Sequence, residues 1–401
     1  MPHRPLNGIR VLDLTNVLAG PYCTYQLMLY GAEVVKVEVP GSGDLARQLG
    51  PDPGLNRIGL GASFLAQNAG KKSVELNLKE EADRTTFEEL VRGADVLVEN
   101  FRAGVLARLG FGWDQLRTLN PSLIYCAITG FGQTGPMSRA PAYDQIIQGL
   151  SGMMSITGTP ETAPLRVGFP ACDTIGGLMA ALAICAALTG RERTGQGCFL
   201  DLSMLEASIS AMGWTATHYV ICGVEPAPMG RQNATAAPSG TFDTAEGRLN
   251  IAANRQSQFE ALCAAVGRPE LISDARFADG EARKRHRELL DVELNAALST
   301  RTAAEWEQIL PAVGIPAARI LTVRQAVDLP QLAHRGFYSE VAFPGDPQRS
   351  IRLSGNGVLL DGEPLRAGGS PPLLGEHNRD VAGLIAERLG LAAVVSDEER
   401  S

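Results

Sequence analysis

The chain has 401 residues, of which 45% are hydrophobic and 20% are charged, and its formal net charge at pH 7 is −8. A chain of this length exceeds the size at which one hydrophobic core stops growing, so we expect two domains. The negative charge argues against nucleic acid as a general partner, because nucleic-acid binding needs clustered positive charge. No apolar run of 18 or more residues is free of breakers, so no membrane span is expected.

The N-terminal sequence and the cysteines both indicate the cellular compartment. The N-terminus runs into a strand pattern without the apolar region of a signal peptide, which predicts a cytoplasmic protein. The seven cysteines are scattered, odd in number and lack a C-x-x-C spacing, so reduced and mostly buried thiols are expected.

From Ile9 onward, short β-rich runs alternate with helical segments, a pattern typical of a mostly parallel, Rossmann-like α/β sheet. Helices are expected at 21–30 and 79–92, from Asp173 onward, and at 204–220. Strands are expected at 9–14, 33–39, 73–78, 94–99, 123–129 and 198–202. An Ala-rich stretch at 178–188 is too short to span a bilayer and is interpreted as a core helix.

The composition changes at residues 222–240, where several prolines and glycines interrupt any regular element. Beyond this stretch, a strand at 248–253 and helices at 256–266, 281–298 and 302–313 indicate a smaller α+β domain. A Pro- and Gly-rich return with a helix at about 378–389 leads back to the first domain. We therefore expect a large domain over 1–221, a linker over 222–240, a small domain over 241–330, and a linker and return over 331–401.

Asp173 follows an extended, Pro-containing approach and begins an Ala- and Gly-rich run that predicts a buried helix. A carboxylate at a helix N-terminus is favoured in its ionised form by the backbone N–H groups and the dipole. Such a carboxylate is a candidate nucleophile, but Asp is also a preferred N-cap residue, and this segment alone fits both roles. Cys172 is a rival nucleophile, although nothing nearby in sequence lowers its pKa.

Other familiar motifs give little support to other chemistries. Gly130 to Gly135 matches G-x-G-x-x-G, but Pro136 and Pro141 keep the following chain irregular, whereas a dinucleotide fingerprint must open a helix. We interpret the segment as a conformationally permissive loop. G-x-S-x-G, Walker A and H-E-x-x-H motifs do not occur, and no histidine lies beside an obvious nucleophile, so neither a Ser-His-Asp triad nor a metal site is predicted.

Ordered segments across nearly the whole chain resemble the class III CoA transferases, a family that includes formyl-CoA transferase and carnitine CoA transferase. The segments that carry the resemblance are 12–21, 31–38, 41–44, 71–74, 95–101, 130–136, 143–144 and 195–197. Asp173 falls at the catalytic aspartate of that family, which favours the nucleophile over the cap.

The resemblance implies a mechanism and an assembly. Asp173 would attack an acyl-CoA to give a mixed anhydride, CoA thiolate would convert the anhydride into an aspartyl-CoA thioester, and an acceptor carboxylate would repeat these steps in reverse. The partners would be an acyl-CoA donor and a free carboxylic acid. The family fold implies an interlocked homodimer, each subunit having a large α/β domain and a small domain.

The resemblance also implies which residues bind CoA as a substrate. They are Val17, Leu18, Ala19, Leu76, Lys79, Asn100, Phe101, Arg102, Arg108 and Tyr143. Two departures matter, because Val39 and Pro141 stand where formyl-CoA transferase has basic residues. The diphosphate contacts must therefore be rearranged, with Arg139 or Arg102 as candidates.

Two alternatives and the question of specificity stay open. An α-methylacyl-CoA racemase would use a His before Asp, but this chain has Tyr143 before Asp144, and a phenol is a poor base at neutral pH. An inactive CoA-binding protein is the other alternative, against which the intact Asp173 argues.

A small dicarboxylate such as succinate or itaconate is the expected acceptor, clamped by Arg166 and Arg255. The absence of a glycine-rich loop at 252–257 argues against oxalate. Candidate oxyanion donors are Gly176, Gly177 and the region of Asn254.

Overall fold

The computed structural model describes residues 4–389, which divide into two compact units. The first comprises the described parts of Met1–Met153, Arg166–Val224 and Pro330–Ser401, and the second comprises Met154–Leu165 and Glu225–Leu329. The segment Met154–Leu165 was expected within the large domain, and the contacts of the chain group it with the second unit instead.

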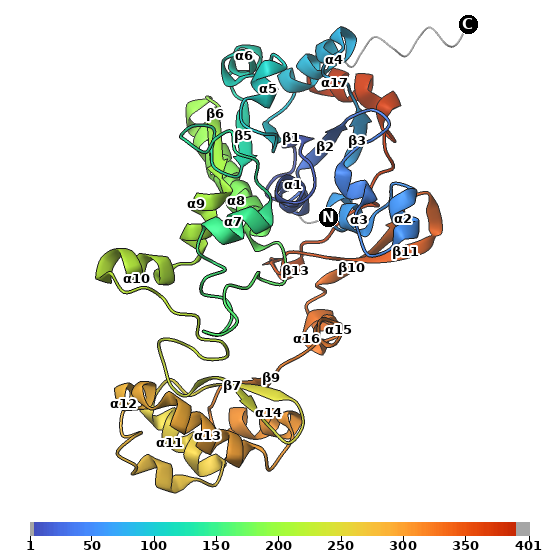
Figure 1. The fold of residues 1–401 in the computed structure, drawn as a ribbon. Coiled ribbons are helices and arrows are strands. Elements are labelled where there is room, and N and C mark those ends of the chain that lie inside the picture. The colour runs from blue at the N-terminus through green and yellow to red at the C-terminus, as the bar shows by residue number, and fades with distance from the viewer. Residues whose placement is uncertain (1–3, 390–401) are drawn as a thin grey trace, which may run out of the picture. The chain divides into compact units, whose positions relative to one another are not determined.

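The first unit is built on a six-stranded sheet in which every strand is parallel to its neighbours, in the order β3-β2-β1-β4-β5-β6 (Figure 1). The strands are β1 (Arg10–Leu14), β2 (Glu33–Glu38), β3 (Lys72–Glu75), β4 (Val96–Glu99), β5 (Ile124–Thr129) and β6 (Cys198–Ser203). The predicted parallel α/β sheet is therefore confirmed. Its central strands read as continuous hydrophobic runs because helices cover both faces.

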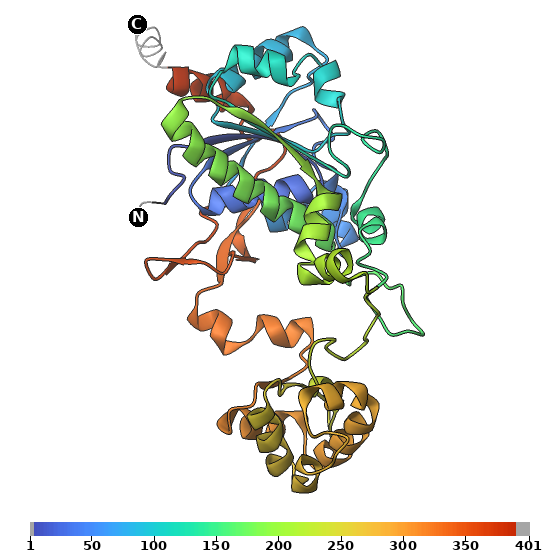
Figure 2. The same ribbon diagram turned by 90° about the vertical axis from the view of Figure 1, so that its left-hand side faces the viewer.

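Successive residues of each strand serve opposite faces of the sheet. Val11 packs with α1 (Ala19–Leu29) and α8 (Ala171–Thr194), whereas its neighbour Leu12 packs with α4 (Glu81–Arg92), α6 (Trp113–Leu119) and α17 (Val381–Leu389). Figure 2 shows α8 as the long green helix lying across one face. The two faces thus have separate hydrophobic cores, and α1 and α8 lie together on one of them.

One helix of the described chain, α8, is long and apolar enough to cross a membrane by length and composition alone. It has 24 residues, so the expectation that this region is too short to span was wrong. Core helices pass the same test, and Gly176, Gly177, Ala180 and Ile184 are buried in the face of α8 that packs on α1 and the sheet.

Shorter elements complete the first unit, and one of them differs from expectation. The helix predicted over 204–220 is two helices, because Gly213 has a φ of +59°, a conformation that interrupts a helix. These elements are η1 (Leu45–Gln48), α2 (Pro53–Arg57), α3 (Ala62–Asn68), α5 (Val105–Arg108), α7 (Asp144–Leu150), α9 (Met204–Ala211), α10 (Trp214–Cys222), α16 (Pro330–His334), β10 (Tyr338–Phe343), β11 (Asp346–Ser354), β12 (Leu359–Leu360), β13 (Glu363–Pro364) and η3 (Asn378–Asp380).

The second unit packs helices on a three-stranded antiparallel sheet of order β7-β8-β9. Its core includes Phe242, Phe259 and Trp306, and the indole N–H of Trp306 donates to the carbonyl of Leu298 at 2.8 Å. The helix predicted over 281–298 is interrupted at His286. The elements are β7 (Ser239–Asp243), β8 (Arg248–Ala252), α11 (Gln256–Ala265), η2 (Pro269–Ile272), α12 (Gly280–Arg285), α13 (Arg287–Leu298), α14 (Ala303–Ala312), β9 (Ala317–Arg319) and α15 (Val323–Val327).

Candidate active site

A cavity of about 340 Å³ lies in the first unit where the chain leaves the carboxyl ends of β1, β4 and β5. The strand order reverses between β1 and β4, and open parallel sheets bind ligands at such a switch point. The topology therefore places a site here before any side chain is considered. Eight of the predicted site residues line it: Val17, Leu18, Ala19, Asn100, Phe101, Arg102, Tyr143 and Asp173.

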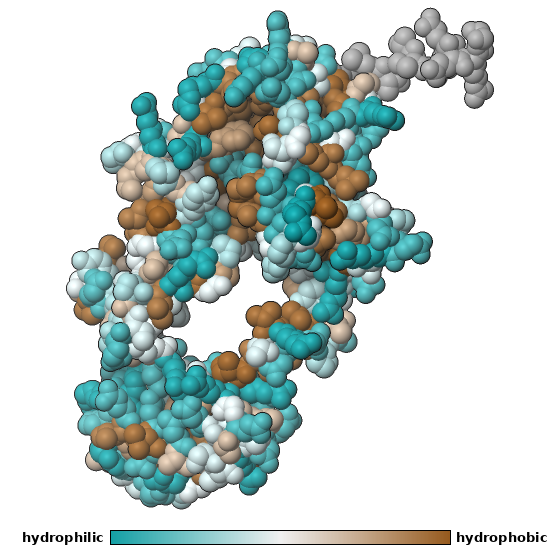
Figure 3. Space-filling view, turned by 45° about the vertical axis from the view of Figure 1, so that its right-hand side comes forward, coloured by the Kyte–Doolittle hydropathy of each residue, from teal (hydrophilic) through white to brown (hydrophobic). Residues whose placement is uncertain are grey.

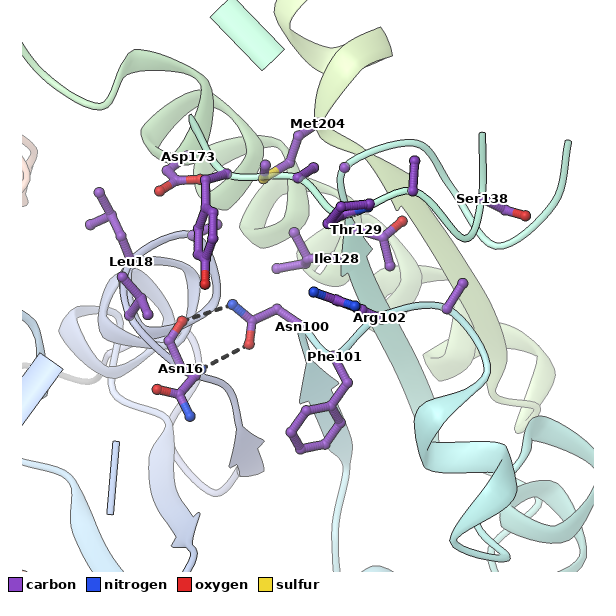
Figure 4. A pocket seen from close by; sticks show the side chains of 18 of the residues that line it. Asn16, Leu18, Asn100, Phe101, Arg102, Ile128, Thr129, Ser138, Asp173 and Met204 are labelled. Atoms are coloured by element: carbon purple, nitrogen blue, oxygen red, sulfur yellow. Dashed lines mark hydrogen bonds between the residues drawn. The ribbon is translucent and has the colours of Figure 1, made fainter. Parts of the chain in front are cut away.

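The loop between β1 and α1 forms one wall of the cavity and holds an unusual backbone conformation. Val17 has a φ of +66°, which a β-branched residue adopts rarely. Its amide donates to Asp44 Oδ1 at 2.9 Å, while Asn16 and Asn100 exchange two hydrogen bonds of 2.8 Å across the cavity wall (Figure 4). Strain of this kind persists where the surroundings enforce it, commonly at functional sites.

Helix α1 begins at this wall with unpaired donors. Leu18 is its N-cap residue and supplies no side-chain cap, and among the described residues the amides of Leu18 and Ala19 find no acceptor. Gly20 lets the chain turn tightly here, because a Cβ at this position would lie 2.3 Å from the side chain of Thr15. Sequence reasoning missed these amides as candidate oxyanion donors.

A buried set of opposite charges supports the loop from below. Asp44 Oδ2 lies 2.9 Å from Lys36 Nζ, which is 3.7 Å from Asp13 Oδ1, and Lys71 Nζ lies 2.9 Å from Asp13 Oδ2. Burial raises the pKa of Asp13, but Lys36 and Lys71 outweigh burial and hold it below its ordinary value. Burial lowers the pKa of Lys71 to about 8 against the attraction of Asp13. The network explains why ionised groups occur beneath an apolar loop.

Asp173 lies in the first turn of α8 and faces the cavity (Figure 4). The N-cap position belongs to Pro170, so the interpretation of Asp173 as a cap is wrong. Burial, reinforced by the negative charge of Asp144, raises the pKa of Asp173 from 3.8 to about 7. Desolvation and a like charge therefore outweigh the helix dipole, so Asp173 is less ionised at pH 7 than its position at a helix N-terminus predicts.

Cys172, the rival nucleophile, is fully buried beside Asp173. Burial raises the pKa of its thiol, which disfavours the thiolate that nucleophilic attack requires. Cys172 does not line the cavity. Its burial favours a packing role over nucleophilic attack.

The residues after β4 form the opposite wall. Glu99 is buried, which raises its pKa to about 7, and it accepts the amide of Phe101 at 2.6 Å and the hydroxyl of Tyr125 at 3.0 Å. These bonds fix the direction in which the chain enters the wall. Arg102 is the one basic residue among those lining the cavity in the described chain, and its side chain makes no ion pair there. It is available for an anionic ligand.

Three predicted CoA contacts lie outside the cavity. Lys79 and Arg108 are solvent exposed, and the side chain of Leu76 is buried in the hydrophobic core. Their roles stay predictions. Pro141 lines the cavity, whereas Val39 and Arg139 do not.

The glycine-rich loop after β5 also lines the cavity and opens no helix at Gly135; the next helix, α7, begins at Asp144. The interpretation against a dinucleotide fingerprint agrees with this geometry. A Cβ on Gly130 would lie 2.3 Å from the side chain of Ala142, so glycine allows the loop to fold closely on itself.

The other residues predicted as oxyanion donors or as contacts for the acceptor acid do not line this cavity. Gly176 and Gly177 lie inside α8, where amides are used by the helix, and a Cβ on Gly177 would lie 2.6 Å from the carbonyl oxygen of Ala19. They are packing glycines, so their prediction as oxyanion donors was wrong. Arg166 Nη2 pairs with Asp144 Oδ2 at 3.2 Å, and Asn254 and Arg255 belong to the second unit.

Comparison with known proteins decides the family. Residues 6–378 match CoA-transferase family III. The chain belongs to this family. As a class III CoA transferase it is an enzyme, which confirms the resemblance on which the sequence analysis relied.

Two curated relatives and one solved structure show how far the similarity to this CoA transferase extends. The present chain is 40% identical to the acetyl-CoA:oxalate CoA-transferase of Acetobacter aceti, over 92% of this chain and 90% of that protein. It is 36% identical to the succinyl-CoA:glutarate CoA-transferase of Mus musculus, over 94% and 86% of the two chains. The crystal structure of a CAIB/BAIF family protein from Brucella suis is 33% identical, with a TM-score of 0.83 over 95% and 99% of the two chains.

Proposed function

We propose that this CoA transferase moves CoA from an acyl-CoA to a small dicarboxylic acid through a covalent intermediate on Asp173. The observation that carries the proposal is the carboxyl group of Asp173 in the wall of the switch-point cavity. It is an oxygen nucleophile that needs no triad, and a pKa of about 7 leaves a substantial ionised fraction at neutral pH.

The proposed reaction balances without a proton donor. An Asp173 oxygen attacks the thioester carbon, the C–S bond breaks, and the electron pair leaves on the CoA sulfur. The thiolate then attacks the Asp173 carbonyl of the mixed anhydride, which releases the first acid and leaves an aspartyl-CoA thioester. The acceptor carboxylate reverses these two steps. The unpaired amides of Leu18 and Ala19 supply donors for the oxygen that gains charge in each attack.

CoA is proposed to bind along the walls formed by residues 16–19 and 100–103. Arg102 is the guanidinium available for a phosphate oxygen, since charge-assisted hydrogen bonds to phosphate suit its planar fork. Lys79 and Arg108 are retained as contacts for the remaining phosphates, outside the cavity. Tyr143, which lines the same cavity as Asp173, contributes an aromatic surface.

A dicarboxylate is proposed as the acceptor because oxalate and glutarate, the acids named for the two curated relatives, both carry two carboxyl groups. The chain lacks an obvious glycine-rich loop at 252–257, but it is 40% identical to an acetyl-CoA:oxalate CoA-transferase. Oxalate therefore belongs in the acceptor panel beside succinate, glutarate and itaconate.

We also propose a homodimer, because α10 is an apolar helix that the described chain leaves uncovered. None of its residues is buried, and Trp214, Val220 and Ile221 are 68%, 81% and 72% exposed. Apolar side chains (brown) lie at the surface of the larger unit in Figure 3. Apolar surface of this extent on one helix is stable when it is covered, and a second copy is the proposed cover.

The test of the mechanism traps the intermediate. The enzyme is incubated with acetyl-CoA or succinyl-CoA and then with hydroxylamine, and the peptide that contains Asp173 is examined by mass spectrometry for a hydroxamate. Asp173→Asn should lose the label and lower transfer by more than about 10³-fold, as removal of a nucleophile does. Cys172→Ala should keep both the label on Asp173 and the transfer activity. A label on Cys172, or full transfer by Asp173→Asn, would refute the mechanism.

A further inference from the structure

The first turn of α8 is capped by a residue from another helix. Asp144, the first residue of α7, accepts hydrogen bonds at Oδ1 from the amides of Cys172 at 2.8 Å and Asp173 at 3.4 Å. The N-cap residue of α8 itself, Pro170, offers no side-chain acceptor. These amides of the first turn would otherwise lack a partner. The side chain of Asp144 thus bonds directly to the backbone of the reacting residue.

Asp144 is itself held in place by two further donors. Its Oδ2 atom accepts Gln148 Nε2 at 2.7 Å and Arg166 Nη2 at 3.2 Å. Gln148 is fully buried and also binds the approach to α8, through the amide of Val167 at 2.9 Å and the carbonyl of Phe169 at 3.2 Å. Four donors, one of them a guanidinium, suit an ionised carboxylate, which is an acceptor at every lone pair.

We propose that Asp144 is a positioning residue for Asp173, which fixes the first turn of α8 through Oδ1 and opposes the negative charge of the unreacted carboxylate. The proposal rests on the covalent role proposed above for Asp173. In this role Asp144 acts on Asp173 and does not contact the substrate.

The charge of Asp144 favours acylation because it raises the free energy of the free Asp173 carboxylate but not that of the acyl-enzyme. The free carboxylate of Asp173 is negative, and burial together with Asp144 raises its pKa to about 7. In the mixed anhydride the Asp173 oxygen has formed a C–O bond and the negative charge has left on the CoA sulfur. Repulsion by Asp144 is therefore present before attack and relieved after it, which destabilises the reactant relative to the acyl-enzyme.

Other titratable groups on the elements packed against α8 do not share this role. The two other carboxylates there, Asp201 of β6 and Glu206 of α9, are solvent exposed, and the charge that acts on Asp173 is that of Asp144. The remaining groups on α1, β5 and β6 are phenols and thiols whose pKa values are raised, chiefly by burial, so they are neutral at pH 7. They are Tyr22, Cys23, Tyr25, Tyr125, Cys126 and Cys198.

The experiment measures the acylation half-reaction, as release of CoA thiol from acyl-CoA, over pH 5 to 9. Asp144→Asn keeps an oxygen acceptor for the two amides but removes the charge. The pKa of about 7 for Asp173 predicts an acid limb of kcat/KM for acyl-CoA near pH 7 in the wild type. In Asp144→Asn this limb should move down by about one pH unit, as loss of a neighbouring like charge predicts. The steady-state amount of acyl-enzyme should fall several-fold at pH 8.

Two further variants keep the test decisive if Asp144→Asn folds poorly. Arg166→Gln removes the counter-charge of Asp144 from a side chain that is 40% exposed, so the acid limb should move upward. Asp279→Asn is the matched control, because Asp279 caps α12 in the second unit through the amide of Ala282 at 2.7 Å, and it should leave the profile unchanged.

The outcomes separate the two proposals. A wild-type enzyme without a label at Asp173 refutes the covalent mechanism itself. A labelled wild type whose acid limb stays fixed in folded Asp144→Asn, or in Arg166→Gln, overturns the role of Asp144 alone. Loss of rate by the same factor at every pH in Asp144→Asn also overturns it, since that is the result of a purely structural cap.

Discussion

At the scale of single residues, Val17 shows how the fold holds the cavity wall in a conformation that the residue itself disfavours. A left-handed conformation costs an L-residue about 1–2 kcal/mol, and Val17 keeps it because its amide is bound by Asp44 while Asn100 binds the preceding residue. Leu18 and Ala19, whose amides find no acceptor among the described residues, follow Val17 directly in the cavity wall. Replacing the side chain tests whether the conformation or the valine matters.

Val17→Gly should change stability by less than about 1 kcal/mol, because relief of backbone strain is offset by the greater entropy of glycine in the unfolded chain. It should nevertheless raise the KM for acyl-CoA several-fold, since the loop loses its fixed conformation and a contact surface. The measurements are urea unfolding and steady-state kinetics for both substrates.

Asp361→Gly is the control for this prediction. Asp361 is the other residue besides glycine with a positive φ in the described chain, at +51°, and it lies outside the cavity. Its replacement should relieve less strain, because Asp adopts the left-handed region more readily than Val, and should change neither KM. Unchanged KM values in Val17→Gly would mean that the loop conformation is not needed for binding.

The sequence predicted eight of the residues that line the cavity but not the residues that hold them in place. Asn100 and Phe101 were found through the resemblance of their segment, and Asp173 through its place at the start of a predicted helix and its match to the catalytic aspartate of the family. The roles of Asp44 and Asp144 were missed because each acts on a backbone amide in another element, 27 and 28 residues away. A short polar residue far from its partner gives no periodic signal, and its role appears with the fold.

At the scale of elements, the loop between β1 and α1 depends on charges buried beneath it. Lys36 on β2 is fully buried, lies 2.9 Å from Asp44 Oδ2, and donates to the carbonyl of Thr15 at 2.7 Å. Asp44 Oδ2 accepts no hydrogen bond within the described chain, so the ammonium of Lys36 provides its compensation. Removing one partner of a buried pair leaves the other uncompensated.

Lys36→Met should therefore lower the free energy of unfolding by about 3–5 kcal/mol. Lys72→Met on the neighbouring strand should cost less than about 1 kcal/mol, because its pair with Glu33 is about one-third exposed on both sides. Urea denaturation at pH 7 measures both variants. Equal losses would contradict the view that burial, rather than ion pairing itself, makes Lys36 essential.

Elements were predictable where packing leaves a regular hydrophobic pattern. The central strands of the parallel sheet are buried on both faces, so their apolar runs gave bounds within a few residues of those observed. Strand β11 was missed because it is polar and mostly exposed. Breaks at Gly213 and His286 were missed because hydrophobic periodicity continues across them, while the backbone conformation does not.

At the scale of the whole molecule, the exposed apolar surface of α10 requires an explanation that a single chain does not give. Exposed apolar residues that occur singly are ordinary, whereas a nine-residue helix without one buried residue is not. A second copy of the chain would cover α10, so this exposed apolar surface favours a dimer.

The enzyme should therefore sediment as a dimer even at nanomolar concentration, and if the subunits are interlocked, dissociation in urea should coincide with loss of helical signal. Val220→Asp combined with Ile221→Asp should disrupt the dimer or cause aggregation, because charges would replace apolar groups at a covered surface. Val292→Asp on α13 is the control: Val292 is 67% exposed on a helix that already buries Leu290, Leu294, Ala297 and Leu298, so the dimer should persist. A native monomer that forms on simple dilution, with α10 uncovered and the protein still folded, would contradict both the dimer and the interlocked arrangement.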